Sequence, residues 1–346
     1  MKNKINVDII DVANHAGVSP ATVSRSFNHP DKVLISTRKR IEKAIAQTGY
    51  IRNRAAQAIH GKRSGTVGLI VPTLDNAIFS NLIQAFSDEM REHSFTMLVA
   101  THGYDLNDEY LLLRSLLEHR VEGVALIGHD HSDDTYNLLE RRNVPAVSMW
   151  NYKQESKLSC VGGENIQAGQ AIANHIIELG HTNIAVAFPD VKENDRARDR
   201  KRGVLDQLSQ AGITVPKKWQ IETEYSIEDA RRSATQMLAN SPRPTAIIAG
   251  NDVIAQGVIY AAQANGLRVP DDISVTGIGD FSGSAASYPS LTTVRMRPNK
   301  VGTTAASLLL ERINGDRNAD PTRIRVSVEV KCRDSSSKVT TNPSSQ

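Results

Sequence analysis

The sequence predicts an all-α helix-turn-helix headpiece at the N-terminus, followed by an α/β domain with parallel sheets arranged in two lobes. Three observations support this fold class. Basic side chains are concentrated in the first 65 residues, two short capped helices flank a glycine near the N-terminus, and apolar runs alternate with amphipathic segments from Thr66 onward. A chain of 346 residues corresponds to two or three folded units, at about 100–200 residues each.

The composition excludes several classes of protein. The two cysteines, Cys160 and Cys332, lie far apart in the chain, which excludes a disulfide scaffold and a cysteine-based zinc cluster. No apolar run approaches the roughly 18 residues that a membrane span requires. The basic N-terminus is not followed by the apolar core of a signal peptide. We therefore expect a cytoplasmic, nucleoid-associated protein with no membrane partner.

The first fifty residues carry the signals of three short helices. Asp8 is a good N-cap for the first helix, and Gly17 permits the left-handed backbone of the turn that ends it. Ser19 caps a second helix that has Pro20 at its first position, where the missing N–H costs nothing. A third helix is expected from Ser36 to Gly49.

The second helix has an outward face that suits the major groove of DNA. Ala13, Val18 and Val23 pack it against the first helix, because small apolar residues allow close approach. The residues left facing outward are Pro20, Ala21, Thr22, Ser24 and Arg25. Residues 1–65 hold twelve basic and four acidic side chains, a net charge of +8, whereas the remaining chain carries −5. Charge alone equally fits a solvated basic surface, but together with the capped helices it favours DNA binding.

Two runs resemble the headpiece of the LacI/GalR (lactose-repressor) family. They are Asp11–Arg25, DVANHAGVSPATVSR, and Thr48–Ala56, TGYIRNRAA, and the similarity continues to about residue 333. The resemblance implies that Pro20 and Ala21 occupy base-reading positions, where we expect apolar contacts such as thymine methyls, with Arg25 as the candidate for guanine. The expected DNA-binding residues are Ser19, Pro20, Ala21, Thr22, Ser24, Arg25, Asn28, Lys32, Tyr50, Asn53, Ala56 and Ile59.

Residues 53–65 are expected to form a hinge. The seven residues Asn53–Ile59 are too few for an isolated helix, which is marginal below about 12–15 residues. The resemblance implies that this segment becomes helical on DNA, paired with its dimer mate. Ile59 stands where the family has a leucine that wedges into the minor groove. The alternative interpretation is a plain interdomain linker.

From Thr66 the alternation of strands and helices predicts parallel sheets with right-handed crossovers. The expected strands are Thr66–Val71, Thr96–Ala100, Gly123–Ile127, Ala146–Met149, Ile184–Phe188, Ala246–Gly250 and Ser274–Ile278. The expected helices are Ser80–His93, Asn107–His119, Ile166–Leu179, Arg198–Ala211, Ile227–Ala239, Asp252–Asn265 and Lys300–Asn314. One continuous sheet of this length would be unusual, so two lobes are expected. The resemblance implies a periplasmic-binding-protein-like pair with a ligand in the cleft.

Loops that directly follow the strands are where such folds bind ligands. In these loops and the adjoining helices, the resemblance implies that the effector-binding residues are Asn76, Phe79, His129, Glu164, Arg200, Tyr225, Asn251 and Asp280. By the resemblance, Arg200 clamps the effector. Gly279 stands where the family commonly has an acid, and that loss of negative charge favours an anionic effector such as a sugar acid. For a single loop Asn or Asp, a helix cap is the usual alternative.

Other functions fit the sequence less well. The loop Gly277–Gly283 nearly matches a dinucleotide-binding pattern, but its third glycine is one position late and it follows the last strand instead of the first. His129, Asp130 and His131 have the residue types of a metal site. They are expected to lie in one loop, where their spacing is unfavourable for binding one ion, so no metal is expected. A sugar-binding transport protein would share the two lobes but would need a signal peptide and no headpiece.

We therefore expect a ligand-responsive, sequence-specific DNA-binding transcriptional regulator, a repressor of carbohydrate catabolism or uptake genes, without enzymatic activity or cofactor. A homodimer would bind a palindromic double-stranded DNA operator, with a sugar or sugar-acid effector between the lobes. The expected boundaries are residues 1–52 for the headpiece, 53–65 for the hinge and linker, 66–333 for the effector-binding and dimerisation domain, and 334–346 for a disordered tail.

Overall fold

The computed structural model describes residues 7–52, 63–75 and 77–339, without the side chains of Ala77 and Ile78. The chain divides into two compact units, Met1–Ser64 and Gly65–Gln346. Among the described residues, no helix combines the length and the apolar composition that a bilayer crossing demands.

The first unit is the predicted three-helix domain, with α1 (Ile9–Ala16), α2 (Pro20–Asn28) and α3 (Ile35–Thr48). The expected caps are confirmed. The Asp8 carboxylate accepts from the backbone N–H groups of Ile10 and Asp11 at 2.8 and 3.0 Å, and Gly17 has the left-handed φ of 61°. The Ser19 hydroxyl accepts from the Thr22 N–H at 3.2 Å.

A small apolar core holds these helices together. Its buried residues are Val12, Ala13, Ala16, Val23, Ile41 and Ala44, with Val18 half-buried beside them. The helix-to-helix packing through Ala13, Val18 and Val23 is therefore confirmed. The helix α3 begins at Ile35, one residue before the predicted Ser36, and a 3-10 turn over Pro30–Lys32 precedes it.

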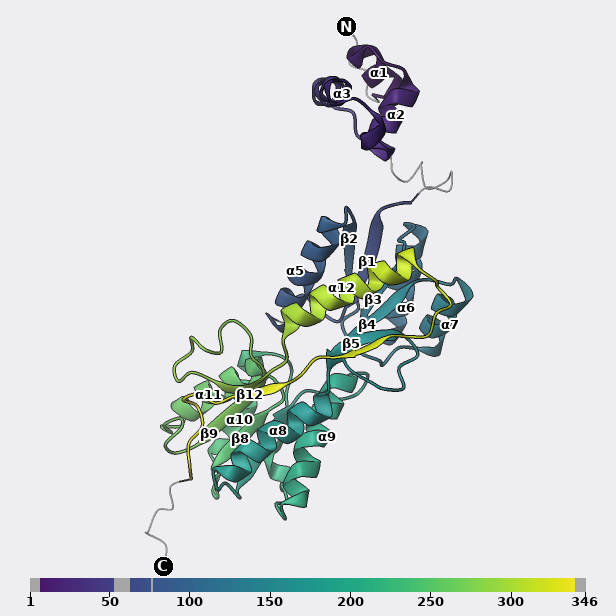
Figure 1. Ribbon diagram of the computed structural model, residues 1–346. Coiled ribbons are helices and arrows are strands. Elements are labelled where there is room, and N and C mark those ends of the chain that lie inside the picture. The colour runs from purple at the N-terminus through teal and green to yellow at the C-terminus, as the bar shows by residue number, and fades with distance from the viewer. Residues whose placement is uncertain (1–6, 53–62, 76, 340–346) are drawn as a thin grey trace, which may run out of the picture. The chain divides into compact units, whose positions relative to one another are not determined.

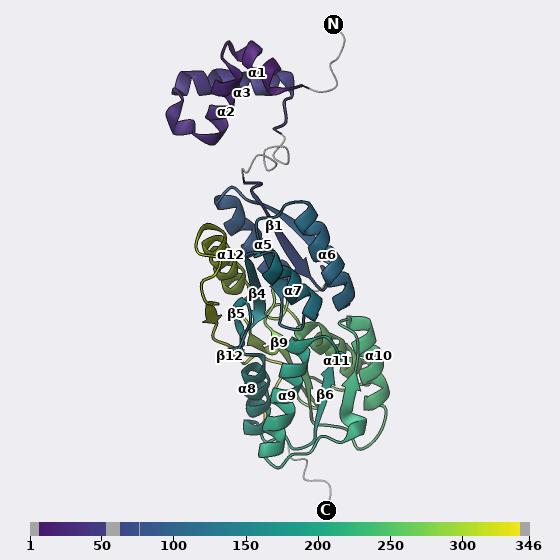
Figure 2. The same ribbon diagram turned by 90° about the vertical axis from the view of Figure 1, so that its right-hand side faces the viewer.

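The second unit contains two six-stranded sheets, one in each lobe (Figures 1 and 2). The first sheet has the order β11-β5-β4-β3-β1-β2, and the second has the order β12-β10-β9-β8-β6-β7. The strands of the first are β1 (Thr66–Val71), β2 (Thr96–Thr101), β3 (Val124–Ile127), β4 (Ala146–Asn151), β5 (Ser159–Gly163) and β11 (Arg323–Arg325). The strands of the second are β6 (Ile184–Phe188), β7 (Gln220–Glu222), β8 (Ala246–Ala249), β9 (Ser274–Gly279), β10 (Thr292–Arg295) and β12 (Glu329–Lys331). Every pair is parallel except β10 with β12.

Helices cover both sheets. Those of the first lobe are α5 (Ala77–Glu92), α6 (Leu106–Glu118), α7 (Asp133–Arg141) and α12 (Pro298–Asn314). Those of the second lobe are α8 (Asn165–Glu178), α9 (Asp195–Gln210), α10 (Ile227–Leu238) and α11 (Asp252–Ala264), with a 3-10 turn at Lys217–Trp219. The central strands β1, β3, β6, β8 and β9 are buried almost throughout, as sheets with helices on both faces require.

The chain passes between the lobes three times. It leaves the first lobe between β5 and α8, returns between β10 and α12, and crosses again between β11 and β12 (Figure 1). We call these three passages the crossover segments. Because they join the lobes side by side, they are the places where any change in lobe closure has to be absorbed.

The structure corrects the expected C-terminal tail at residues 334–339. Ser335 is fully buried, its hydroxyl donates to the Val275 carbonyl at 2.6 Å, and its own carbonyl accepts from the Val275 N–H at 2.8 Å. His181 binds the Ser337 carbonyl through Nε2 at 3.0 Å. The serines that suggested disorder are thus hydrogen-bonded to the second lobe. Residues 340–346 lie outside the described part of the chain.

Candidate functional sites

The outward face of α2 presents the predicted base-reading residues. Pro20, Ala21 and Arg25 are exposed, whereas Thr22 and Ser24 are half-buried. Ser19 is exposed too, and its hydroxyl lies 2.9 Å from that of Thr22. A groove of about 590 Å³ runs along this face, lined by Ala21, Ser24, Arg25, Asn28, His29, Arg52 and Arg63. The helix therefore offers a mixed apolar and cationic surface, which is the chemistry that a DNA groove edge requires.

Asn28 is held between α2 and the segment after α3. Its side-chain amide donates to the Ser24 carbonyl at 2.9 Å, and its oxygen accepts from Nη2 of Arg52 at 2.6 Å. The Arg52 guanidinium lies 5.1 Å from the centre of the Phe27 ring, and Tyr50 packs 6.4 Å from the same ring. Sequence reasoning placed Asn28 and Tyr50 here but missed Arg52, whose role depends on contacts between distant residues.

The remaining predicted DNA contacts divide into two groups. Lys32 is exposed at the end of the turn before α3. Asn53, Ala56 and Ile59 lie outside the described residues, as does the effector candidate Asn76. The DNA-binding and effector-binding roles expected for these four residues stay predictions.

Arg200 is one of the deeply buried effector candidates. It lies on α9 with 3% of its surface exposed. Its Nε donates to the Asn165 side-chain oxygen at 2.7 Å, and its Nη1 donates to the Gly250 carbonyl at 2.9 Å. Both acceptors are neutral, and burial lowers the pKa of Arg200 from its ordinary value. Within the described residues, no ion pair joins this guanidinium to a carboxylate.

Asn251 and its neighbour Asp252 follow strand β8 at the start of α11. Asn251 is fully buried and caps the helix, because its Oδ1 accepts from the Ile254 N–H at 2.9 Å. Its Nδ2 is buried without an acceptor among the described residues. Asn251 is therefore both the helix cap that the alternative interpretation expected and a donor that a ligand could satisfy.

Tyr225 stacks on an aromatic ring from the other lobe. Its ring lies 5.8 Å from that of Tyr104, which follows β2, with 21° between the ring planes. The Tyr225 hydroxyl accepts from the Asn194 amide at 3.1 Å, and Asn194 also caps α9. Tyr104 and Asn194 were not predicted, because neither the ring stack nor the shared hydrogen bond leaves a local pattern in the sequence.

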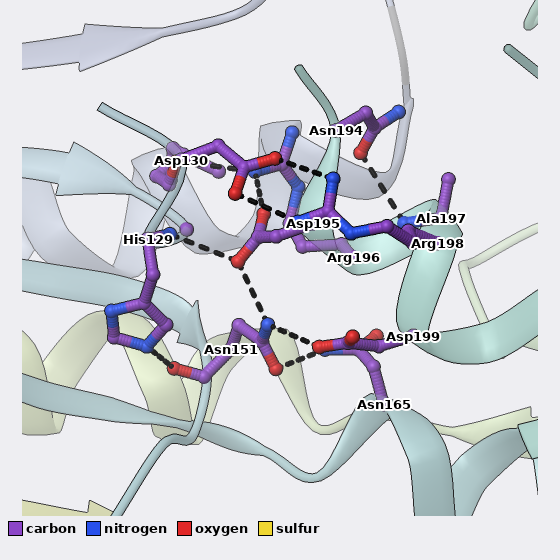
Figure 3. A network of polar contacts seen from close by, with 12 residues as sticks. His129, Asp130, Asn151, Asn165, Asn194, Asp195, Arg196, Ala197, Arg198 and Asp199 are labelled. Atoms are coloured by element: carbon purple, nitrogen blue, oxygen red, sulfur yellow. Dashed lines mark hydrogen bonds and ion pairs between the residues drawn. The ribbon is translucent and has the colours of Figure 1, made fainter. Parts of the chain in front are cut away.

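His129 belongs to a polar network that joins the lobes (Figure 3). Its backbone N–H donates to Oδ2 of Asp195 at 2.9 Å, and its ring Nε2 donates to the Asn151 carbonyl at 2.8 Å. The Asn151 amide donates to Asp195 at 2.8 Å and to Asp199 at 3.0 Å. His129 and Asn151 come from the first lobe, whereas both aspartates come from α9. The network thus fixes the position of α9, and with it Arg200, against the first lobe.

The same network extends to Arg200 and to a second ion pair. Asn165 donates to the Asn151 side-chain oxygen at 2.9 Å while accepting from Arg200. Arg198 makes two bonds of 2.8 Å to the Asp130 carboxylate across the lobes. Burial raises the pKa of Asp195, but Arg196 and the bond from Asn151 outweigh it, so that pKa lies below its usual value. Asp195 is accordingly an ionised acceptor at the centre of the network.

Three other predicted effector residues have different partners in the structure. Phe79 is buried and packs edge-on against Trp150 at 5.8 Å, as a core residue does. Glu164 pairs with Arg325 at 3.0 Å. The Asp280 carboxylate is held by Arg295 and by Arg333, so it does not turn toward Arg200. These long-range arginine partners could not be read from the local sequence.

The side chains of the His129–His131 run have partners elsewhere in the fold. His131 is buried against Glu109 at 2.9 Å, and Asp130 pairs with Arg198. Throughout the described ranges, no group of three or more His, Cys, Asp or Glu side chains is placed to hold a metal ion.

Comparisons with known proteins match both units. Residues 8–53 match the family described as bacterial regulatory proteins, lacI family, and residues 173–336 match the periplasmic binding protein-like domain. The HTH-type transcriptional repressor PurR of Erwinia tasmaniensis is 31% identical over 91% of this chain and 92% of the relative. PurR of Proteus mirabilis is 31% identical over 89% of this chain and 91% of its own length.

Solved structures agree with these relatives. The lac repressor dimer bound to operator and the anti-inducer ONPF has a TM-score of 0.83 at 27% identity, covering 96% of this chain and 99% of that one. The transcription regulator GntR from Chromobacterium violaceum has a TM-score of 0.73 at 26% identity, covering 78% of this chain and 99% of that one.

Proposed function

Because the chain belongs to the lacI family of bacterial regulatory proteins, we propose that it is a homodimeric repressor released from or recruited to a palindromic operator by an anionic sugar derivative. The family assignment makes the protein a DNA-binding transcriptional repressor with an effector-binding domain, and not an enzyme. The proposal adds the class of effector, the carbohydrate genes that it would regulate, and the dimer.

The DNA interface rests on charge and on the exposed face of α2. The first 65 residues carry +8 and the rest of the chain −5, so the headpiece is the part attracted to phosphates. Two copies related by a two-fold axis would present two α2 helices to two half-sites, which is why the operator is expected to be palindromic. Selection of bound duplexes from a random pool tests this proposal. The expected product is a symmetric sequence, and enrichment of a single asymmetric half-site would contradict the dimer.

The effector class rests on one observation, the buried cationic Arg200 with only neutral acceptors. A buried charge is costly unless an opposite charge or several hydrogen bonds compensate it. A ligand carboxylate in the cleft would supply that charge, and the planar guanidinium suits a carboxylate. The unsatisfied Asn251 amide adds a donor suited to sugar hydroxyls. A sugar acid such as D-gluconate therefore has the required chemistry.

The stacked rings of Tyr104 and Tyr225 favour a second candidate, a ligand with a flat face. A flat neutral ligand, represented by hypoxanthine, would use the rings but would leave Arg200 without a counter-charge. The two candidates therefore differ in the charge that the ligand brings to the cleft.

A thermal-shift screen with D-gluconate, D-glucuronate, cellobiose and hypoxanthine separates these classes, because a ligand that binds only the folded state raises the melting temperature. We expect a sugar acid to give the largest rise and to change operator affinity. Arg200→Met should abolish both effects while the variant still binds the operator. Lys192→Gln, at an exposed residue of the loop before α9, is the matched control. A full sugar-acid response in Arg200→Met would contradict the proposal, and a response to hypoxanthine alone would favour the second candidate.

A further inference from the structure

A second cavity lies at the crossover segments, away from Arg200. It has a volume of about 660 Å³ and is lined by parts of two crossover segments, Arg295–Lys300 and Ile324–Ser327, together with Asn81 of α5 and Asp280. We call it the crossover cavity. Its lining does not include Arg200, Tyr225 or Asn251. A ligand held there would be separate from the proposed effector, and the inference goes beyond the proposed function.

The crossover cavity has an excess of positive charge. Four cations line it, Arg295, Arg297, Lys300 and Arg325, against one lining carboxylate, Asp280. The ion pairs do not remove this excess. Asp280 is shared by Arg295 and Arg333, Glu329 by Arg297 and Lys331, and Glu164 pairs with Arg325. Within the described residues, five cations therefore pair with three carboxylates, and a sixth cation, Lys300, is in no ion pair.

The backbone at the cavity wall also offers donors. Helix α12 begins here, with Arg297 as its N-cap at a left-handed φ of 54°, no side-chain cap and no acidic residue in its first turn. The N–H groups of Asn299 and Lys300 are in that first turn, where a helix provides no acceptor. The positive end of the helix dipole adds to the four cations.

An independent observation is a donor that is buried without an acceptor. The Nε of Arg297 is shielded from solvent and has no hydrogen-bond partner among the described residues. Nη2 of the same guanidinium donates to Glu329 at 3.1 Å, the one hydrogen bond of this side chain within the described part of the chain. Buried N–H groups in folded proteins nearly always have an acceptor. An anion in the cavity would provide one for Arg297 and would compensate the excess charge.

We propose that the crossover cavity binds a phosphate dianion, either inorganic phosphate or the phosphoryl group of a small metabolite. Guanidinium groups bind phosphate oxygens in pairs, and phosphate also accepts from the free N–H groups of a helix N-terminus. The volume of about 660 Å³ exceeds what a bare phosphate fills and falls within the roughly 300–1,000 Å³ of small-molecule sites. The ligand would contact both crossover segments at once.

The test compares inorganic phosphate with D-glucose 6-phosphate, using the full-length protein at constant ionic strength. Chloride, an anion without a phosphoryl group, and D-glucose, the sugar without its phosphate, are the controls. Both phosphates are expected to raise the melting temperature and to bind in calorimetry, and chloride and glucose are not. Tighter binding of glucose 6-phosphate would identify a phosphorylated metabolite as the ligand class, and equal binding would identify the phosphate group alone.

Variants decide where the phosphate binds. Lys300→Gln removes an exposed cation that forms no ion pair in the described structure, so the fold should persist, and phosphate affinity should fall at least tenfold. Lys217→Gln, at an exposed lysine of the second lobe, is the control and should leave that affinity unchanged. Arg200→Met should also leave it unchanged, which separates this site from the proposed effector site. Equal affinity in Lys300→Gln and Lys217→Gln, loss of phosphate binding in Arg200→Met, or absence of binding to the wild-type protein would each overturn the proposal.

Discussion

At the scale of single residues, Asp252 shows how burial and hydrogen bonding compete. Its carboxylate has 1% exposure and accepts from the Asp280 N–H at 2.8 Å and from the hydroxyls of Ser284 and Thr293, each at 2.5 Å. Burial raises the pKa of Asp252 from 3.8 to about 6 because desolvation outweighs those bonds. Ionised Asp252 therefore lowers the stability of the second unit while it holds the loop after β9 in place.

This shift predicts a pH-dependent stability. The folded state binds the Asp252 proton more tightly than the unfolded state, so the free energy of unfolding falls as pH rises from about 4 to about 6 and then levels. Asp252→Asn mimics the protonated form and abolishes this fall. The variant should therefore become more stable than the wild type as pH rises from 4.5 to 8. The difference between their free energies of unfolding should grow by up to about 3 kcal/mol for a shift of about two pKa units.

Urea unfolding followed by tryptophan fluorescence measures this difference, since both tryptophans, Trp150 and Trp219, lie in the second unit. Asp88→Asn on α5 removes a partly exposed carboxylate that pairs with Arg91 and provides the control. The assignment fails if the stability difference between Asp252→Asn and wild type is the same at both pH values.

At the scale of secondary-structure elements, helices α8 and α9 approach each other through two glycines. A Cβ on Gly203 would lie 2.1 Å from the Ile166 carbonyl oxygen, and one on Gly169 would lie 2.3 Å from the Arg200 carbonyl oxygen. Both obstacles are backbone atoms, which cannot rotate away. The close crossing therefore sets where α9 carries Arg200.

We expect Gly203→Ala to push the two helices apart. The cost should be about 1–3 kcal/mol of unfolding free energy, as for other overpacked cores, despite the better helix propensity of alanine. The sugar-acid response should weaken as well, because Arg200 moves with α9. Ser209→Ala, at an exposed position of the same helix, should change stability by less than about 0.5 kcal/mol. Urea unfolding of both variants measures the effect, and equal stabilities would show that the helices accommodate the methyl group.

The elements also show which structural features a sequence reveals. The caps Asp8 and Ser19 and the apolar strand β1 were predictable because their signals are local. The strands β7, β11 and β12 were not, since each has three residues, lacks a continuous apolar run and exists through pairing with a distant strand. Among the helices of the first lobe, α12 was predicted with a start two residues too late, whereas the polar helix α7 was not predicted at all.

The candidate site divides in the same way. Position after a strand and the family resemblance pointed to Arg200 and Asn251 as effector residues; both side chains are buried, and their role stays a prediction. The sequence did not reveal that the Asp280 carboxylate is held by Arg295 and Arg333, because these partners lie 15 and 53 residues away in the sequence. Tyr104 and Asn151 contact residues of the other lobe, and Asn194 binds Tyr225 within its own lobe, 31 residues away; no local pattern records these contacts.

At the scale of the whole molecule, the two units differ in charge, and operator binding should reflect only the positive one. A dimer that neutralises about 6–10 phosphates loses about 10³–10⁵ in affinity between 50 and 200 mM salt. Lys32 is exposed in the turn before α3 and has no side-chain ion pair within the described ranges. It is therefore suited to contact a phosphate without reading a base.

Lys32→Gln should then weaken binding to every duplex by a similar factor and make the salt dependence shallower. Each lost phosphate contact reduces the slope of log affinity against log salt by about one, so a dimer should lose about two and a monomer about one. Fluorescence anisotropy across a salt series, on the selected palindrome and on a scrambled duplex, measures both slopes. Lys217→Gln in the acidic unit should leave them unchanged. A change of slope on the palindrome alone would instead make Lys32 a base-reading residue, and a loss of one would mean that a single headpiece engages the DNA.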